Sequence, residues 1–178
     1  VPAGDPSDPG RHTNAVKVLV VPAAEGDHLG RLRIEQMVVP PDTLERIASY
    51  LDERRVVGAR VIVEPPTYQG ITIAARVRAS TKAQPSHVSD AASRALYRYY
   101  HPIVGGPDGT GWPFGRPVHA GEVYAVLQRV EGVEYLEEVR LYAADPRDGR
   151  RGEAVQSLEF GLNSLVFSYE HALRVDQR

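Results

Sequence analysis

The 178-residue chain contains no cysteine, which excludes disulfide bonds, thiolate metal sites and cysteine nucleophiles. It has no apolar run long enough to span a membrane, and its first residues lack the pattern of a signal peptide. The net charge is only −2, so nothing favours bulk attraction to nucleic acid or to anionic membranes. Composition therefore predicts neither a nucleic-acid partner nor a membrane partner.

Lysine is almost absent as well. Of the 21 lysine and arginine residues only Lys17 and Lys82 are lysines, which leaves nineteen arginines. A GC-rich gene is one explanation for this bias. Protein interfaces are another, because the planar guanidinium forms bidentate ion pairs and stacks on aromatic rings.

Residue patterns that carry catalysis or bind cofactors are also missing. None of the six histidines has the spacing of a metal site, and no Gly-x-Ser-x-Gly nucleophile elbow occurs. The glycine-rich stretch at residues 105–116 lacks the Gly-Lys-Ser/Thr ending of a P-loop, and Pro113 stands where a dinucleotide site needs a backbone N–H donor. The sequence predicts a protein without metal or cofactor that is not an enzyme.

What is present is a well-patterned chain. Its length and its 42% hydrophobic content fit one domain with a sizeable core. Residues 1–14 contain three prolines and two glycines and are expected to form a flexible tail or linker, followed by a single domain over residues 15–175. Because the chain does not begin with Met, we expect it to be a piece of a longer protein or a processed protein.

Apolar periodicity predicts three helices. The first starts at Asp42 as N-cap and stops at Gly58; the second runs from Ser86 to about Tyr100; and the third is defined by apolar residues between 123 and 130.

Alternating apolar residues predict the strands. Residues 61–64 and 71–78 are expected to form a hairpin with a wide loop, and other strands are expected near 16–20, 133–141 and 165–175. Glu137 and Glu138 are consecutive in an expected strand, so their carboxylates are predicted to point to opposite faces of the sheet.

This order of elements predicts an α+β fold. A mixed or antiparallel sheet carries helices on one face in a split β-α-β, ferredoxin-like arrangement, with an extra helix and C-terminal strands.

The most distinctive segment is residues 105–116, in which glycines and prolines surround Trp112, the only tryptophan. Glycine and proline exclude a helix or a plain strand here, and the aromatic side chains predict an ordered loop. Exposed Trp, Tyr and Arg side chains are typical anchors of protein interfaces. We therefore expect protein contacts in the loop from Ile103 to Pro117 and around Tyr68. The candidate interface residues are Tyr68, Tyr100, Trp112, Phe114 and Arg116.

Several segments together resemble the C-terminal part of the baseplate assembly proteins in the baseplate J-like wedge family. This family occurs in contractile-tailed phages and phage-tail-like contractile injection systems. The segments are residues 50–58, 61–68, 109–116, 122–127, 132–135 and 168–171, and the similarity extends over roughly residues 15 to 175. The run from Gly111 to Arg116, Gly-Trp-Pro-Phe-Gly-Arg, is the most specific of them. Members of the family are usually much longer, with further domains before this region.

The resemblance implies a structural role without enzymatic activity or cofactor. Such proteins are wedge components that associate with each other, with a second wedge protein, and with the hub, spike and sheath. Assembly would take place in the cytoplasm, after which the protein would be part of a virion or tail-like particle.

Two other functions stay open from the residues alone. One is a ligand-binding or hydrolytic domain with a pocket lined by Tyr100, His101, Trp112 and His119. The other is a small nucleic-acid or regulatory module, which the charge and the absence of aromatics on the exposed face of residues 71–78 count against. The surroundings of Trp112 distinguish the first from a structural role, since a scaffold requires the indole to pack on the domain's own helices.

Overall fold

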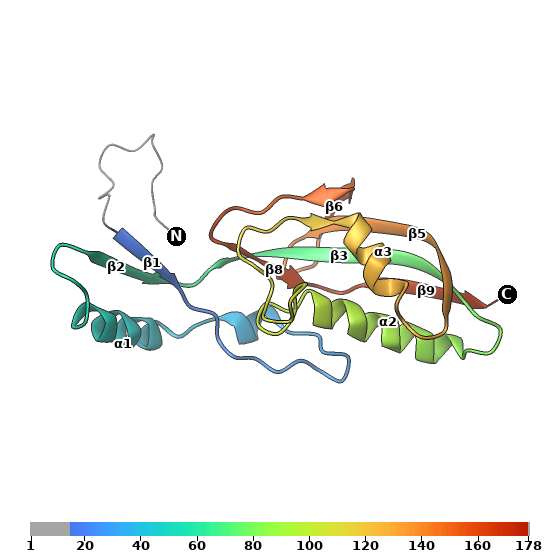
Figure 1. The fold of residues 1–178 in the computed structure, drawn as a ribbon, viewed down its shortest axis with the longest axis horizontal. Coiled ribbons are helices and arrows are strands. Elements are labelled where there is room, and N and C mark those ends of the chain that lie inside the picture. The colour runs from blue at the N-terminus through green and yellow to red at the C-terminus, as the bar shows by residue number, and fades with distance from the viewer. Residues whose placement is uncertain (1–14, 178) are drawn as a thin grey trace. The chain divides into compact units, whose positions relative to one another are not determined.

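The computed structural model describes residues 15–177, which form an α+β fold with mixed sheets (Figure 1). The expected α+β class is confirmed. The expected tail at residues 1–14 lies outside the described residues. Within residues 15–177, no helix is both long and apolar enough to cross a membrane.

The chain divides into two compact units where a single domain over 15–175 was expected. Unit 1 comprises the described residues up to Pro22 together with Met37–Pro66, and unit 2 comprises Ala23–Gln36 and the chain from Thr67 onward. The chain thus leaves unit 1 after its first strand and returns to it before its helix.

Unit 1 is a single β-α-β motif. Strand β1 (Ala15–Leu19) pairs in parallel with β2 (Arg60–Glu64), and helix α1 (Pro41–Asp52) connects them and packs against β2. Lys17 and Glu64 form an ion pair, with 2.8 Å between Nζ and Oε1. The helix begins one residue before Asp42, which lies in the first turn near the positive end of the helix dipole. It ends at Asp52, well before Gly58.

The expected hairpin between residues 61–64 and 71–78 is wrong. Strand β2 pairs with β1, whereas β3 (Thr67–Ala79) belongs to unit 2 and pairs with other strands. Only Pro65 and Pro66 separate β2 from β3. Consecutive prolines fix φ and keep the preceding residue extended, so this connection cannot make the tight reversal that a hairpin requires.

Strand β3 is the centre of the sheet of unit 2. Strand β5 (Val133–Ala144) pairs with it antiparallel on one side, and β6 (Arg151–Val155) follows β5. On the other side β8 (Ser164–Ser168) and then β9 (Ala172–Gln177) pair with β3 in parallel. A small second sheet joins β4 (Val118–His119) to β7 (Ser157–Leu158).

The core of unit 2 lies between the large sheet centred on β3 and the helices of this unit. Helix α2 (Pro85–Tyr99) packs along β9, and α3 (Ala120–Leu127) packs along β5 (Figure 1). Alternate residues of β3 face them and are at most 4% exposed: Ile71, Ile73, Ala75, Val77 and Ala79. A short 3-10 helix, η1 (Ile34–Met37), covers the point in the sequence where the chain passes from unit 2 back to unit 1.

A β-bulge corrects the prediction for Glu137 and Glu138. The register of β3 against β5 shifts between Arg76 and Val77, which leaves Glu137 as the extra residue of β5. Glu137 accepts a hydrogen bond from Arg78, and Glu138 is bonded to Arg140, whose side chain lies on the same open face as those of Arg76 and Arg78. The two carboxylates therefore share one face of the sheet, because a bulge breaks the strict alternation of side chains.

Candidate interaction site

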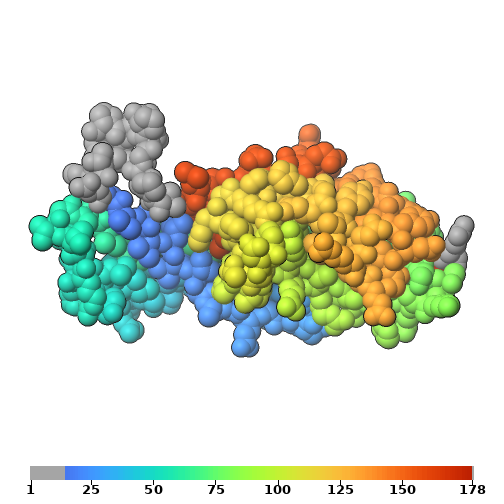
Figure 2. All heavy atoms as spheres, viewed as in Figure 1, coloured from blue at the N-terminus to red at the C-terminus, as the bar shows by residue number. Residues whose placement is uncertain are grey.

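The loop of residues 103–117 is ordered by its own backbone hydrogen bonds. The N–H of Gly106 donates to the carbonyl of Tyr99 at the end of α2 (2.7 Å), and the N–H of Gly111 donates to the carbonyl of Gly105 (2.8 Å). Gly106 has φ +79°, and a Cβ there would lie 2.4 Å from the carbonyl oxygen of Gly111. Only glycine fits this close approach in the left-handed region. Figure 2 shows the loop, coloured yellow, at the surface.

Trp112 anchors the loop to α2. Its side chain is 3% exposed, and its ring centroid lies 5.6 Å from that of Tyr99 and 5.0 Å from that of Tyr100. The edge-on and tilted geometries of these pairs are favourable for aromatic rings. The indole Nε1 donates to the carbonyl of Arg116 at 3.2 Å, so the loop also closes on itself. Trp112 therefore packs on the chain's own helix, as a scaffold role requires.

Arg116 continues this packing towards α3. Its guanidinium lies 4.6 Å from the centroid of the Trp112 ring and forms an ion pair with Glu122. Glu122 in turn accepts the backbone N–H of His119 (3.3 Å) and the hydroxyl of Tyr99 (3.3 Å). Burial, reinforced by the negative charge of Glu122, raises the pKa of Tyr99. One carboxylate thus links the loop, α2 and the first turn of α3.

His101 fixes the start of the loop. Its Nδ1 accepts the backbone N–H groups of Ile103 (3.1 Å) and Val104 (3.3 Å), and burial lowers the pKa of the imidazole. Because the charged form would carry a proton on Nδ1, these two bonds favour the neutral ring. His101 acts here as a turn-forming side chain.

The five residues predicted for the interface divide into two groups. Tyr100 and Trp112 are buried, and the hydroxyl of Tyr68 is buried although the residue is partly exposed. Burial raises the pKa of Tyr68 to about 12, and it also raises the pKa of Tyr100. Phe114, by contrast, is 41% exposed, and Arg116 is partly exposed. Tyr100 and Trp112 pack beneath the loop, and Phe114 and Arg116 are the predicted loop residues that a partner can reach.

Sequence reasoning missed one apolar neighbour of the loop. The N–H of Gly115 donates to the carbonyl of Ser164 (3.0 Å), and a Cβ at Gly115 would lie 3.2 Å from the Cα of Leu162. Leu162 is 74% exposed. The turn before β8 therefore brings an exposed leucine beside Gly115 of the loop, although the two residues are far apart in the sequence, and no local pattern predicts that.

Of the four residues expected to line the pocket of a ligand-binding or hydrolytic domain, two border a common cavity. Tyr100 and His101 border a small cavity with Tyr97 and Ser168, but Trp112 and His119 do not line it. His119 is exposed at the start of α3. Among residues 15–177, no cluster of three or more potential metal ligands is found.

A second histidine with a ring that makes interior contacts lies at the junction between β8 and β9. The Nδ1 of His171 accepts the backbone N–H of Ile73 (3.2 Å), and its ring stacks on Tyr97 at 4.7 Å. The residue as a whole is partly exposed, but its Nε2 is buried and has no partner among the described residues. Burial, with the positive charge of Arg151 as a second cause, lowers the pKa of His171 to about 3. The His171 side chain thus accepts the Ile73 N–H of β3 at the gap between β8 and β9, where neither strand pairs with β3.

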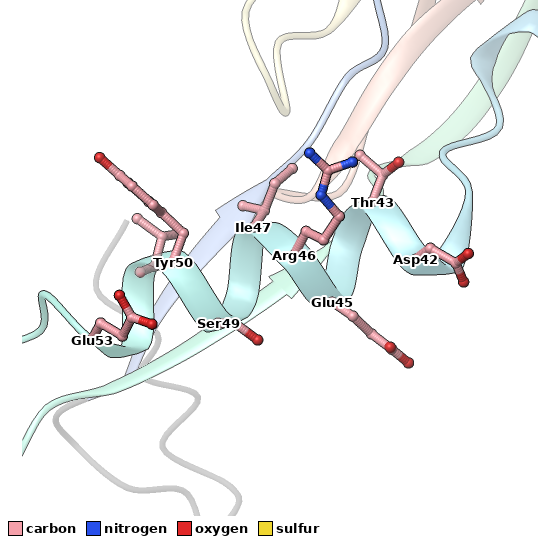
Figure 3. Close-up of a pocket in the computed structure, with 9 residues that line it drawn as sticks. Asp42, Thr43, Glu45, Arg46, Ile47, Ser49, Tyr50 and Glu53 are labelled. Carbon is pink, nitrogen blue, oxygen red and sulfur yellow. The ribbon is translucent and has the colours of Figure 1, made fainter.

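Unit 1 carries a different kind of surface. An open groove of about 780 Å³ runs along α1 and is lined by residues of that helix, including Arg46, Ile47 and Tyr50. Figure 3 shows Thr43, Arg46 and Ile47 directed to one side of the helix and Glu45 and Ser49 to the other. No residue of α1 is fully buried.

Comparison with known proteins gives one kind of match. No family model matches the chain, and no curated protein matches it. Among solved structures, the chain is similar to a protein in the cryo-EM structure of the anti-feeding prophage (AFP) baseplate, with a TM-score of 0.49 and 19% sequence identity. The match covers 74% of this chain and 26% of that chain, so the similar region spans about a quarter of the other protein.

Proposed function

We propose that the protein is a structural component of the baseplate wedge of a phage-tail-like contractile particle, where it holds neighbouring subunits together. The motif resemblance described above supports this role, in particular the run from Gly111 to Arg116. The proposed partners are other wedge subunits, further copies of this chain, and the hub, spike and sheath proteins. Assembly would take place in the cytoplasm, before the protein becomes part of the particle.

The single observation that carries the proposal is the construction of the loop at residues 103–117. Trp112 and Arg116 fix it to α2 and α3, while Phe114 stays exposed. An exposed aromatic on a rigid support binds a partner without first losing conformational freedom. Large aromatic side chains in such positions contribute much of the binding energy of protein interfaces.

We further propose that the chain has no catalytic activity of its own. Tyr100, His101 and Trp112 make packing contacts and turn-forming hydrogen bonds, which give each of them a structural role.

The test is particle assembly with a variant that alters Phe114 alone. Phe114→Asp places a charge on the exposed contact without disturbing the Trp112 packing, so the purified chain should fold normally while the yield of intact particles from the producing cells falls at least tenfold. Tyr135→Asp is the matched control, because it places the same charge at a similarly exposed aromatic (44%) on β5. Wild-type yields of contractile particles with Phe114→Asp would overturn the proposed contact. Substrate turnover that depends on Trp112 would overturn the non-enzymatic role.

A further inference from the structure

Unit 1 presents two valines at the tip of a rigid turn. The turn comprises Val56–Ala59, between α1 and β2, and the N–H of Ala59 donates to the carbonyl of Val56 at 3.1 Å. Gly58 has φ +87° at the third position, which is the geometry of a type II turn. Val57 is 103% exposed and Val56 is 74% exposed. We call residues 56–59 the valine turn.

Side chains next to the valine turn hold its shape. The Nη1 of Arg55 donates to the carbonyl of Ala59 (2.9 Å), and the Nε of the same arginine is bonded to Asp52. The Arg54 guanidinium lies 3.8 Å from the centroid of the Tyr50 ring and donates to the carbonyl of Tyr50 at 3.0 Å. The turn is therefore braced on the last residues of α1.

The residue types contradict what a solvated turn favours. Turns at a surface are rich in Gly, Pro, Asn, Asp and Ser, and a β-branched apolar side chain gains nothing from full exposure to water. No described atom would lie within 4 Å of a Cβ at Gly58, so nothing among residues 15–177 crowds that side of the turn. The conformation of the turn explains why position 58 is a glycine and why Arg55 bonds to Ala59. It gives no reason for apolar side chains at Val56 and Val57.

We propose that the valine turn inserts into an apolar depression with a carboxylate rim on a partner protein. The apolar floor matches Val56 and Val57. Arg54 is paired with Glu53 and Arg55 with Asp52. Arg60 adds the net positive charge beside the turn for which the carboxylate rim supplies a partner. Tyr50 is 58% exposed and stacks under Arg54. Tyrosine and arginine are among the residues that contribute most to binding at protein interfaces.

A membrane is a poorer match than a protein pocket. Stable attachment to a bilayer needs a large apolar face or several basic residues, and two valines with one net positive charge supply neither. This contact lies in unit 1, apart from the loop contact of the proposed function, and each can fail without the other.

The test is photo-cross-linking of the full chain in the cells that produce it, whether or not particles are recovered. A benzophenone amino acid replaces Val57, or Val38 as the matched control, since Val38 is 67% exposed in the same unit. The expected product joins position 57 to another protein at an apolar residue that has Asp or Glu nearby. Equal labelling from position 38, attachment to lipid, or no product would each overturn the proposal.

Variants then measure the contact with the partner so identified. Val57→Asp should weaken co-purification at least tenfold, the scale expected from losing one buried valine side chain. Val57→Ile should stay within about twofold of wild type, because it keeps an apolar side chain of similar shape. Neither change alters packing among residues 15–177, since Val57 is fully exposed there. Equal binding by both variants would overturn the proposal.

Discussion

Helices α1 and α2 have the same kind of sequence pattern and different surroundings. Both place apolar residues on one face, yet α2 buries Val88, Ala92, Leu96 and Tyr97, whereas α1 buries none of its residues. The difference lies in the sheets beneath them. Strand β3 has neighbours on both sides, while β1 and β2 form a sheet of only two strands. A pattern of apolar residues shows which face of a helix is to be covered, and the amount of covering structure decides how far it is buried.

The two unusual loops repeat this contrast. In unit 2 the loop at residues 103–117 directs its largest apolar residue, Trp112, into the domain. In unit 1 the valine turn directs Val57 into solvent. Parallel sheets are normally covered on both faces, and a two-stranded sheet is marginally stable by itself. The described part of unit 1 therefore leaves more of its apolar surface exposed than unit 2 does, which is the basis of the contact proposed for the valine turn.

The largest expected effect is on unit 2. Trp112→Ala removes a 3%-exposed indole and should lower the free energy of unfolding by about 3 to 5 kcal/mol. Phe114→Ala, two residues along the same loop, should cost less than about 1 kcal/mol because its ring is 41% exposed. Denaturant titration of both variants checks this. Equal losses in the free energy of unfolding would show that Trp112 does not anchor the loop more strongly than Phe114 does.

The comparison of the two helices is tested by matched leucines. Leu96→Ala in α2 should cost about 2 to 5 kcal/mol, and Leu51→Ala in α1, where the side chain is only half-buried, should cost about 1 kcal/mol. Amide hydrogen exchange reports each unit separately, and amides of α1 should exchange faster than those of α2. Equal protection of the two helices would contradict the difference in burial.

A smaller effect concerns pH. His171 is neutral in the folded chain because its pKa is lowered to about 3, whereas an exposed histidine titrates near 6.5. The unfolded chain therefore binds the extra proton first, and stability is lost as the pH falls from about 6.5 towards 3. The free energy of unfolding should fall by about 2 kcal/mol between pH 7 and pH 5 from this residue.

Two variants separate the contribution of His171 to the pH dependence of stability from that of other histidines. His171→Gln stays neutral and offers an oxygen to the N–H of Ile73, so most of the acid dependence in that range should disappear. His87→Gln, on the exposed side of α2, should retain it. Unfolding curves at pH 7 and pH 5 decide the matter, and a slope unchanged by His171→Gln would refute the role of this ring.

The smallest effect is expected for the ion pair that links the loop to α3. The side chains of Arg116 and Glu122 are 30% and 18% exposed. Removing both in a double-mutant cycle, with Arg116→Ala and Glu122→Ala, should give a coupling energy of about 1 kcal/mol. A coupling near zero would leave the Trp112 packing as the anchor of the loop by itself.

Local patterns predicted the existence of most elements but not all of their ends or pairings. The three helices were found because apolar residues recur at helical spacing, but α1 stops at Asp52, six residues before the Gly58 that was expected to end it. The strand expected over 165–175 is two strands, because the chain breaks at Tyr169–His171 and a histidine side chain bridges the gap. The bulge at Glu137 likewise leaves no mark in the local alternation.

Sequence alone determined the α+β class, the existence of the helices and the ordered conformation of the glycine-rich loop. These depend on side-chain spacing, on the backbone freedom of glycine and on the fixed φ of proline. Tertiary structure alone decided that β2 pairs with β1 and not with β3, that Trp112 is buried while Phe114 stays exposed, and that Leu162 lies beside the loop. These outcomes depend on contacts between residues far apart in the chain. Such contacts are selected by the packing and hydrogen bonding of whole elements, and no short stretch of sequence contains that information.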